Sequence, residues 1–163
     1  MDLAKASRDP WVWGQLALFL GIGLAAPLLP RHVNLGAADF MLNRVDPNWL
    51  RWLGVIPLVL GATLAVWGIR SLGTSLTPGT EPLPQGDLVT TGAYARIRHP
   101  IYAGVVLLLA GYTLLWSNWT MALLFGVIAL KFFQAKARVE ESLMSQRFPA
   151  YTTYMRHVPR QVL

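Results

Sequence analysis

Two short polar clusters contain the residue types that could carry chemistry in this chain. Residues 92–104 read GAYARIRHPIYAG, which places two arginines, His99 and two tyrosines directly before an apolar run. Residues 136–141 read KARVEE, so two basic residues stand just before two adjacent carboxylates. A basic group on one wall of a pocket and a carboxylate on the other suit a zwitterionic amino-acid group, because its carboxylate and its ammonium need opposite partners. We therefore treat the two clusters as candidate halves of one site.

Tyr94 and Tyr102 add aromatic faces and hydroxyls to the first cluster. Such side chains can hold a purine or a cation. An amino acid joined to a purine describes S-adenosylmethionine, which is therefore the candidate ligand. The sequence shows no cluster of metal ligands, and we expect no metal. It also contains no cysteine, which excludes a thiolate ligand and a cysteine nucleophile.

Four apolar segments must position these clusters, and we expect each to be a membrane-spanning helix: residues 11–29, 49–69, 101–116 and 119–133. The first two are close to the ~20 residues that cross a bilayer. Only Ser117 and Asn118 separate the third from the fourth, which predicts a tight helical hairpin. Such a hairpin returns to the membrane face where it began, so the two polar clusters are expected at the same level.

The other segments complete a single domain over residues 1–163. Residues 71–100 are rich in proline and glycine, and a loop of this length in a compact fold is usually functional or disordered. We take it to be an ordered cofactor loop. Residues 134–163 form a C-terminal tail that begins as an amphipathic helix. The fold predicted is an all-α integral membrane bundle of about four transmembrane helices.

Basic residues predict the orientation of this bundle. If the N-terminus is cytoplasmic and all four segments span, only Arg31, Arg44 and Arg51 of the 14 basic residues lie outside. Basic residues favour the cytoplasmic side, so both termini, the loop and the tail are expected there. We expect the first apolar run to be retained as a signal-anchor span rather than cleaved.

The composition excludes an ordinary soluble domain. Hydrophobic residues make up 54% of the chain and charged residues 13%, against about 25% charged in soluble domains. The mean hydropathy is +0.42. A net charge of +6 on so apolar a chain is better explained by anionic lipid headgroups than by nucleic acid. We therefore expect contact with membrane lipids and no nucleic-acid partner.

The polar residues also have an ordinary explanation when each is taken alone. The basic residues of the first cluster could be anchors in front of a span. The two carboxylates could form surface ion pairs with Lys136 and Arg138 one helical turn earlier, worth about a few tenths of a kcal/mol each. Only the expected convergence of the two clusters favours a binding site.

The order of the motifs adds a resemblance. Residues 91–104 and 140–143 are followed by a spaced set of apolar and aromatic residues: Phe148, Tyr151, Tyr154, Val158 and Pro159. This pattern, over roughly residues 71–160, resembles the isoprenylcysteine carboxyl methyltransferase and phospholipid methyltransferase superfamily. The short chain is similar to small prokaryotic members, which implies an integral membrane enzyme of the prokaryotic cytoplasmic (inner) membrane.

The resemblance also implies the cofactor, S-adenosylmethionine, and the residues that bind it: Leu88, Val89, Tyr94, His99, Pro100, Ile101, Tyr102 and Glu140. In the carboxyl methyltransferases a basic residue shortly before that glutamate contacts the substrate. The spacing selects Lys136 and the residue type selects Arg138, and we prefer Arg138. Arg138 and Glu141 are the candidate catalytic residues.

Methyl transfer from a sulfonium needs alignment of the acceptor and exclusion of water more than it needs acid–base chemistry. A carboxylate acceptor requires no base, whereas an amine must first lose a proton, to Glu141 or to a water chain. We favour carboxyl O-methylation of a hydrophobic or lipid-like acceptor that enters from the bilayer. The alternatives are N-methylation of a phospholipid such as phosphatidylethanolamine, an NADPH-dependent sterol-type membrane reductase, and a membrane protein without enzymatic activity.

Overall fold

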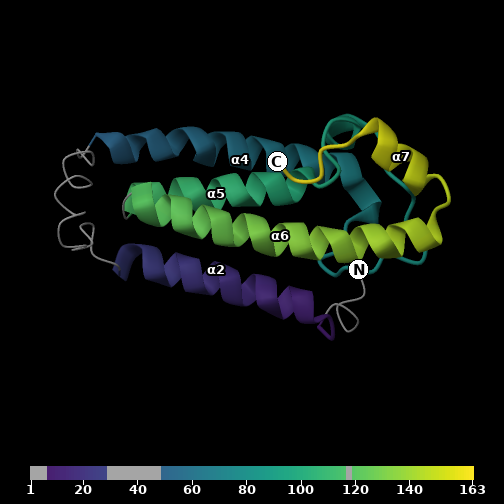
Figure 1. The fold of residues 1–163 in the computed structure, drawn as a ribbon, viewed down its shortest axis with the longest axis horizontal. Helices are drawn as coiled ribbons and strands as arrows, with labels where there is room; N and C mark the ends of the chain where they lie inside the picture. Colours follow the sequence, from purple (N-terminus) through teal and green to yellow (C-terminus); the bar gives the residue numbers. More distant parts are fainter. Residues whose placement is uncertain (1–6, 29–48, 117–118) are drawn as a thin grey trace.

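The structure is a computed structural model that describes residues 7–28, 49–116 and 119–163 (Figure 1). All the regular structure in these residues is helical: α2 (Pro10–Leu28), η1 (Leu50–Gly54), α4 (Val55–Leu72), η2 (Gly73–Ser75), η3 (Gly92–Ala95), α5 (Pro100–Trp116), α6 (Trp119–Arg147) and α7 (Tyr151–His157). The all-α prediction is confirmed. The predicted turn at Ser117 and Asn118, Leu29 at the end of the first predicted span, and Arg31 and Arg44 lie outside the described residues.

Three of the described helical stretches are long and apolar enough to cross a membrane: Pro10–Leu28, Arg51–Ser75 and Trp119–Arg147. Helix α5, at 17 residues, is about 26 Å long and slightly short of a ~30 Å hydrocarbon core. Helix α6 continues without a break for 29 residues, about 44 Å. Its last turns therefore extend beyond a bilayer core and carry the second polar cluster with them.

Glycines at seven-residue spacing hold α4 and α5 close together. A Cβ built on Gly61 would lie 2.5 Å from the Gly104 carbonyl oxygen, and one built on Gly54 would lie 2.6 Å from that of Gly111. Small residues allow such close approach of helices in membranes. The contact sets the start of α5, and the polar cluster before it, against the end of α4.

Helix α2 covers the other side of the α5–α6 pair (Figure 1). Its Ile22 packs with Val106, Ala129 and Phe133 in a buried cluster. The start of α2, the start of α5, the end of α6 and α7 all lie at one end of the bundle (Figure 1). The loop after α4 and the tail therefore lie at the same end of the bundle, and their side of the membrane stays a prediction.

Candidate active site

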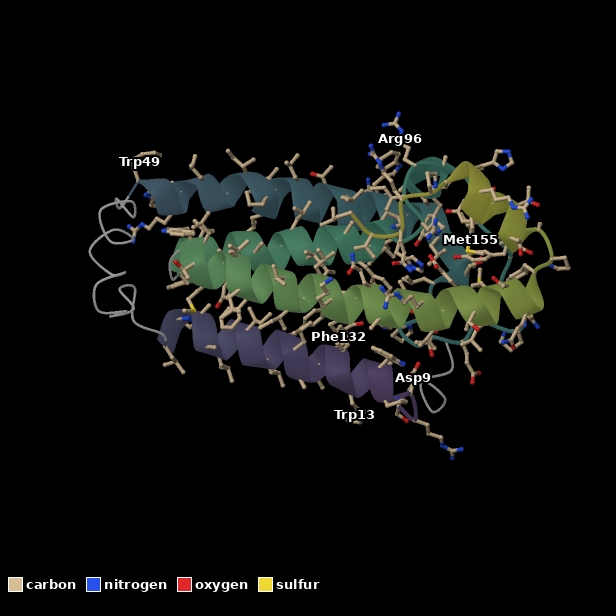
Figure 2. All side chains as sticks on the ribbon, in the orientation of Figure 1. Asp9, Trp13, Trp49, Arg96, Phe132 and Met155 are labelled. Carbon is tan, nitrogen blue, oxygen red and sulfur yellow. The ribbon has the colours of Figure 1, made fainter. Side chains whose placement is uncertain are left out.

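The two polar clusters meet at this end of the bundle. The Nε2 atom of His99 lies 3.2 Å from Oε1 of Glu141, and its Nδ1 atom lies 3.5 Å from Oε2 of Glu140. Arg98 donates from Nε to the same Glu141 oxygen at 2.8 Å. Tyr102 donates its hydroxyl hydrogen to Glu140. Figure 2 shows side-chain nitrogen and oxygen atoms gathered here, while the rest of the bundle is mostly carbon.

The pairing differs from the expectation of opposite walls. We expected the imidazole and the carboxylates to face each other across a pocket, but they contact each other directly. Charged groups taken out of water need a partner, and direct pairing supplies one. His99 also stacks on Tyr102, with ring centroids 5.4 Å apart and planes 1° from parallel. Burial opposes a charge on His99, but its hydrogen bonds to Glu140 and Glu141 outweigh burial and raise its pKa.

A cavity of about 410 Å³ opens beside this cluster. Most of the predicted cofactor residues line it: Leu88, Val89, Tyr94, His99, Ile101, Tyr102 and Glu140. Pro100 is not among the lining residues; it is the buried first residue of α5, where its fixed φ suits a helix start. The loop after α4 supplies much of the wall, and α7 supplies Tyr151 and Tyr154.

The structure brings Lys136, and not Arg138, to the cavity. Lys136 is 1% exposed and lines the wall, whereas Arg138 is exposed and is not a lining residue. Residues that are two positions apart on an α-helix differ by about 200° around the helix axis. The side chains of Lys136 and Arg138 therefore leave α6 on opposite faces. Glu141 is not a lining residue either, and its oxygens accept from Arg98, His99 and Gln161.

Lys136 connects three parts of the fold. Its Nζ atom donates to Oε1 of Gln15 at 2.9 Å and to the carbonyl oxygen of Pro78 at 3.1 Å, and it lies 5.3 Å from the centre of the Tyr102 ring. The two hydrogen-bond acceptors are neutral. They satisfy two N–H groups but leave the positive charge available to an anionic ligand.

Two tyrosines of α7 form part of the cavity wall at this end of the bundle. Tyr151 and Tyr154 are neighbours on α7, with ring centroids 5.5 Å apart. Tyr154 donates its hydroxyl hydrogen to the Tyr94 carbonyl oxygen at 2.7 Å, which ties α7 to the motif loop. Burial is the main cause that raises the pKa of Tyr154 to about 12, so its hydroxyl stays protonated as a donor near neutral pH.

Comparison with known proteins shows the family to which this chain belongs. A model of the phospholipid methyltransferase family matches residues 49–150. The chain belongs to that family. Protein-S-isoprenylcysteine O-methyltransferase B of Arabidopsis thaliana is 30% identical over 117 residues, covering 70% of this chain and 59% of that protein. The corresponding protein of Schizosaccharomyces pombe is 37% identical over 73 residues, covering 44% and 31%. The resemblance inferred from the motifs is confirmed, and the chain is an integral membrane protein.

The relatives of this family member also carry other names. A nickel-cobalt-cadmium resistance protein of Alcaligenes xylosoxydans xylosoxydans is 29% identical over 116 residues, covering 70% of this chain and 52% of that protein. The chain spans about half the length of the curated relatives it matches. Family membership therefore establishes the protein class, while activity and acceptor have to be argued from the site.

Sequence reasoning missed the contribution of the first helix. Asp9 accepts hydrogen bonds from the loop residue Thr80, and Gln15 holds Lys136. A glutamine inside an apolar helix was a visible signal, since a polar side chain at membrane depth usually faces the protein interior. Asp9 directly before Pro10 resembles a helix cap, and nothing in the sequence connected it to Thr80.

Proposed function

We propose that this chain is an S-adenosylmethionine-dependent membrane methyltransferase that methylates the carboxylate of a hydrophobic or lipid-like acceptor. The observation that carries the proposal is the charge pattern on one cavity wall. Lys136 and Glu140, one helical turn apart on α6, both line the cavity. A methyl donor with an ammonium group and an acceptor with a carboxylate would each find an opposite charge there.

The lining residues fit the donor. Glu140 suits its ammonium group, and Arg98 and His99 provide the cationic side for its carboxylate. The ring of Tyr94 suits its adenine, whereas the Tyr102 ring already stacks on His99 and Phe133. The volume of about 410 Å³ falls in the ~300–1,000 Å³ range of small-molecule sites. When bound, S-adenosylmethionine supplies a methyl group already activated by its sulfonium.

The chain's own residues then have simple tasks. The loop covers the cavity and excludes water, and Lys136 orients the acceptor carboxylate for in-line attack. Methyl transfer from a bound sulfonium donor to a carboxylate oxygen would require no proton to be removed from the acceptor. Glu141, the candidate base, is bonded to three donors and lies off the cavity. This arrangement favours a carboxylate acceptor over an amine.

Product chemistry tests the proposal. Detergent-solubilised protein is incubated with methyl-labelled donor and either a prenylated cysteine or phosphatidylethanolamine vesicles. Label on a carboxyl methyl ester is released by alkali as volatile methanol, and label on nitrogen is retained. We expect alkali-labile label on the carboxylate acceptor, reduced in Lys136→Met and kept in Arg138→Met. Alkali-stable label on the phospholipid would instead establish the amine alternative.

A further inference from the structure

The chain beyond α7 returns to the candidate site. Figure 1 shows it turning back from the end of α7 toward the middle of the molecule. We name residues 158–162 the C-terminal strap. The Arg98 N–H donates to the Arg160 carbonyl oxygen and the His99 N–H donates to that of Gln161, both at 2.9 Å. The strap therefore pairs, backbone to backbone, with the motif that precedes α5.

Two side chains fasten the ends of the strap. Arg98 donates from Nη1 to the carbonyl oxygens of Val158 and Pro159, at 2.7 and 2.9 Å. At the other end, Val162 is buried with Ala103 of α5 and Ala137 of α6. The strap is thus held between the two helices that carry the polar clusters, and its position is tied to theirs.

Gln161 links the strap to the carboxylates. Its Nε2 atom donates to Oε2 of Glu141 at 3.0 Å, while Oε1 of Glu141 accepts from Arg98 and His99. Both oxygens of Glu141 are therefore fixed by donors. His99 in turn uses its other nitrogen on Glu140. A series of contacts leads from Gln161, which does not line the cavity, to Glu140, which does.

We propose that Gln161 is a positioning residue of the site: through Glu141 and His99 it holds Glu140 in the orientation that binds the donor's ammonium group. This inference rests on the proposed function, because it concerns the same cavity. The physical reason is that the carboxylates of Glu140 and Glu141 compete for the same imidazole. Two adjacent carboxylates share one imidazole, and a carboxylate that loses a donor attracts the remaining donors more strongly. Without the Gln161 amide, Glu141 draws His99 toward itself, and Glu140 loses its imidazole partner and keeps the Tyr102 hydroxyl.

A series of substitutions at this position separates positioning from folding. Gln161→Lys keeps a donor of similar reach, Gln161→Leu removes the donor, and Gln161→Glu sets a third carboxylate against the other two. The affinity for S-adenosylhomocysteine is measured by calorimetry in detergent, well below the melting temperature of each variant. We expect the leucine variant to bind about tenfold more weakly, as for one hydrogen bond to a charged group. The glutamate variant should bind more weakly still, and the lysine variant close to wild type.

Leu163→Ala is the matched control, because that side chain is next to the strap and is exposed. It should leave the affinity unchanged. Wild-type affinity in both the leucine and the glutamate variant, with or without a lower melting temperature, would overturn the proposal and leave the strap a purely structural element.

A second measurement needs no ligand, so it separates this inference from the proposed function. His99 contacts Glu140 and Glu141 on α6, stacks on Tyr102 of α5 and follows Arg98 in the chain, while Lys136 of α6 lies over the Tyr102 ring. In nitrogen-15 histidine spectra, Gln161→Glu should raise the pKa of His99 above its wild-type value, because it adds a negative charge to this network. If wild type fails to bind S-adenosylhomocysteine, the proposed function fails, and an unmoved His99 titration would then contradict the connection from Gln161 as well.

Discussion

Asp9 and Thr80 are 71 residues apart in the chain, yet Oδ2 of Asp9 accepts hydrogen bonds from both the backbone N–H and the hydroxyl of Thr80, at 2.6 and 2.8 Å. Figure 2 shows Asp9 on the inner side of the start of α2, while Trp13 points outward. Lys136 adds hydrogen bonds to Gln15 and Pro78 close by. The cavity loop is therefore closed against α2 as well as against the helices that carry the motifs.

Asp9→Asn should weaken this closure. Burial raises the pKa of Asp9, but the hydrogen bonds from Thr80 outweigh burial and lower it below the ordinary 3.8. The charged carboxylate thus stabilises the fold above about pH 3.8, and this contribution is lost as pH falls through the lowered pKa. We expect a loss of about 1 kcal/mol at pH 7, measured as a lower melting temperature in detergent. A difference from wild type that does not shrink below pH 3.5 would contradict this assignment.

His99→Gln should destabilise the protein by about 3 kcal/mol, because it leaves two poorly hydrated carboxylates without their shared cation. The pKa of His99 is raised above its ordinary 6.5, so its stabilising charge is fully present below pH 6.5 and is lost as pH rises through the raised pKa. Thermal melts at several pH values should therefore show wild type and variant converging at alkaline pH. A gap of constant size would show that the ring acts by packing alone.

Gly104→Leu should separate α4 from α5. A Cβ at this glycine would lie 2.6 Å from the Gly61 carbonyl oxygen and the same distance from the Ala65 nitrogen. Overpacking of this kind typically costs about 1–3 kcal/mol. Gly21→Leu on α2 is the control, since nothing lies within 4 Å of a Cβ there. Melting temperatures should fall only for the first variant; equal values would argue against the close helix contact.

The orientation of the bundle across the membrane can be determined by labelling single introduced cysteines, because the chain itself contains no cysteine. Arg156 is exposed on α7, and Trp49 is exposed at the opposite end of the bundle (Figure 2). In cells treated with a membrane-impermeant maleimide, Trp49→Cys should react directly and Arg156→Cys only after permeabilisation. The reverse pattern would place the cavity on the outer side of the membrane.

Much of the site followed from the sequence, because a hairpin between two apolar segments necessarily returns its polar flanks to one level. The sequence also indicated which residues share one face of α6. Phe133, Lys136, Ala137 and Glu140 have the spacing of a single helix face, and Arg138 does not lie on that face. We gave residue type more weight than the helix face, and we therefore preferred Arg138 as the basic residue that contacts the substrate.

Other features had weaker signals or none. The seven-residue spacing of Gly54, Gly61 and Gly68 predicts a close contact with another helix, but it does not show which helix makes that contact. The strap and the pairing of Asp9 with Thr80 depend on where extended segments run after the helices have packed, which no local pattern encodes.

The most direct test of the central claim is calorimetric titration of the solubilised protein with S-adenosylhomocysteine, with NADPH as the competing ligand class. Wild type should bind S-adenosylhomocysteine and not NADPH. Glu140→Gln, which keeps the shape but removes the charge facing the ammonium group, should weaken binding by about tenfold or more, and Arg138→Met should match wild type. Equal affinity in wild type and Glu140→Gln, or binding of NADPH alone, would contradict the account.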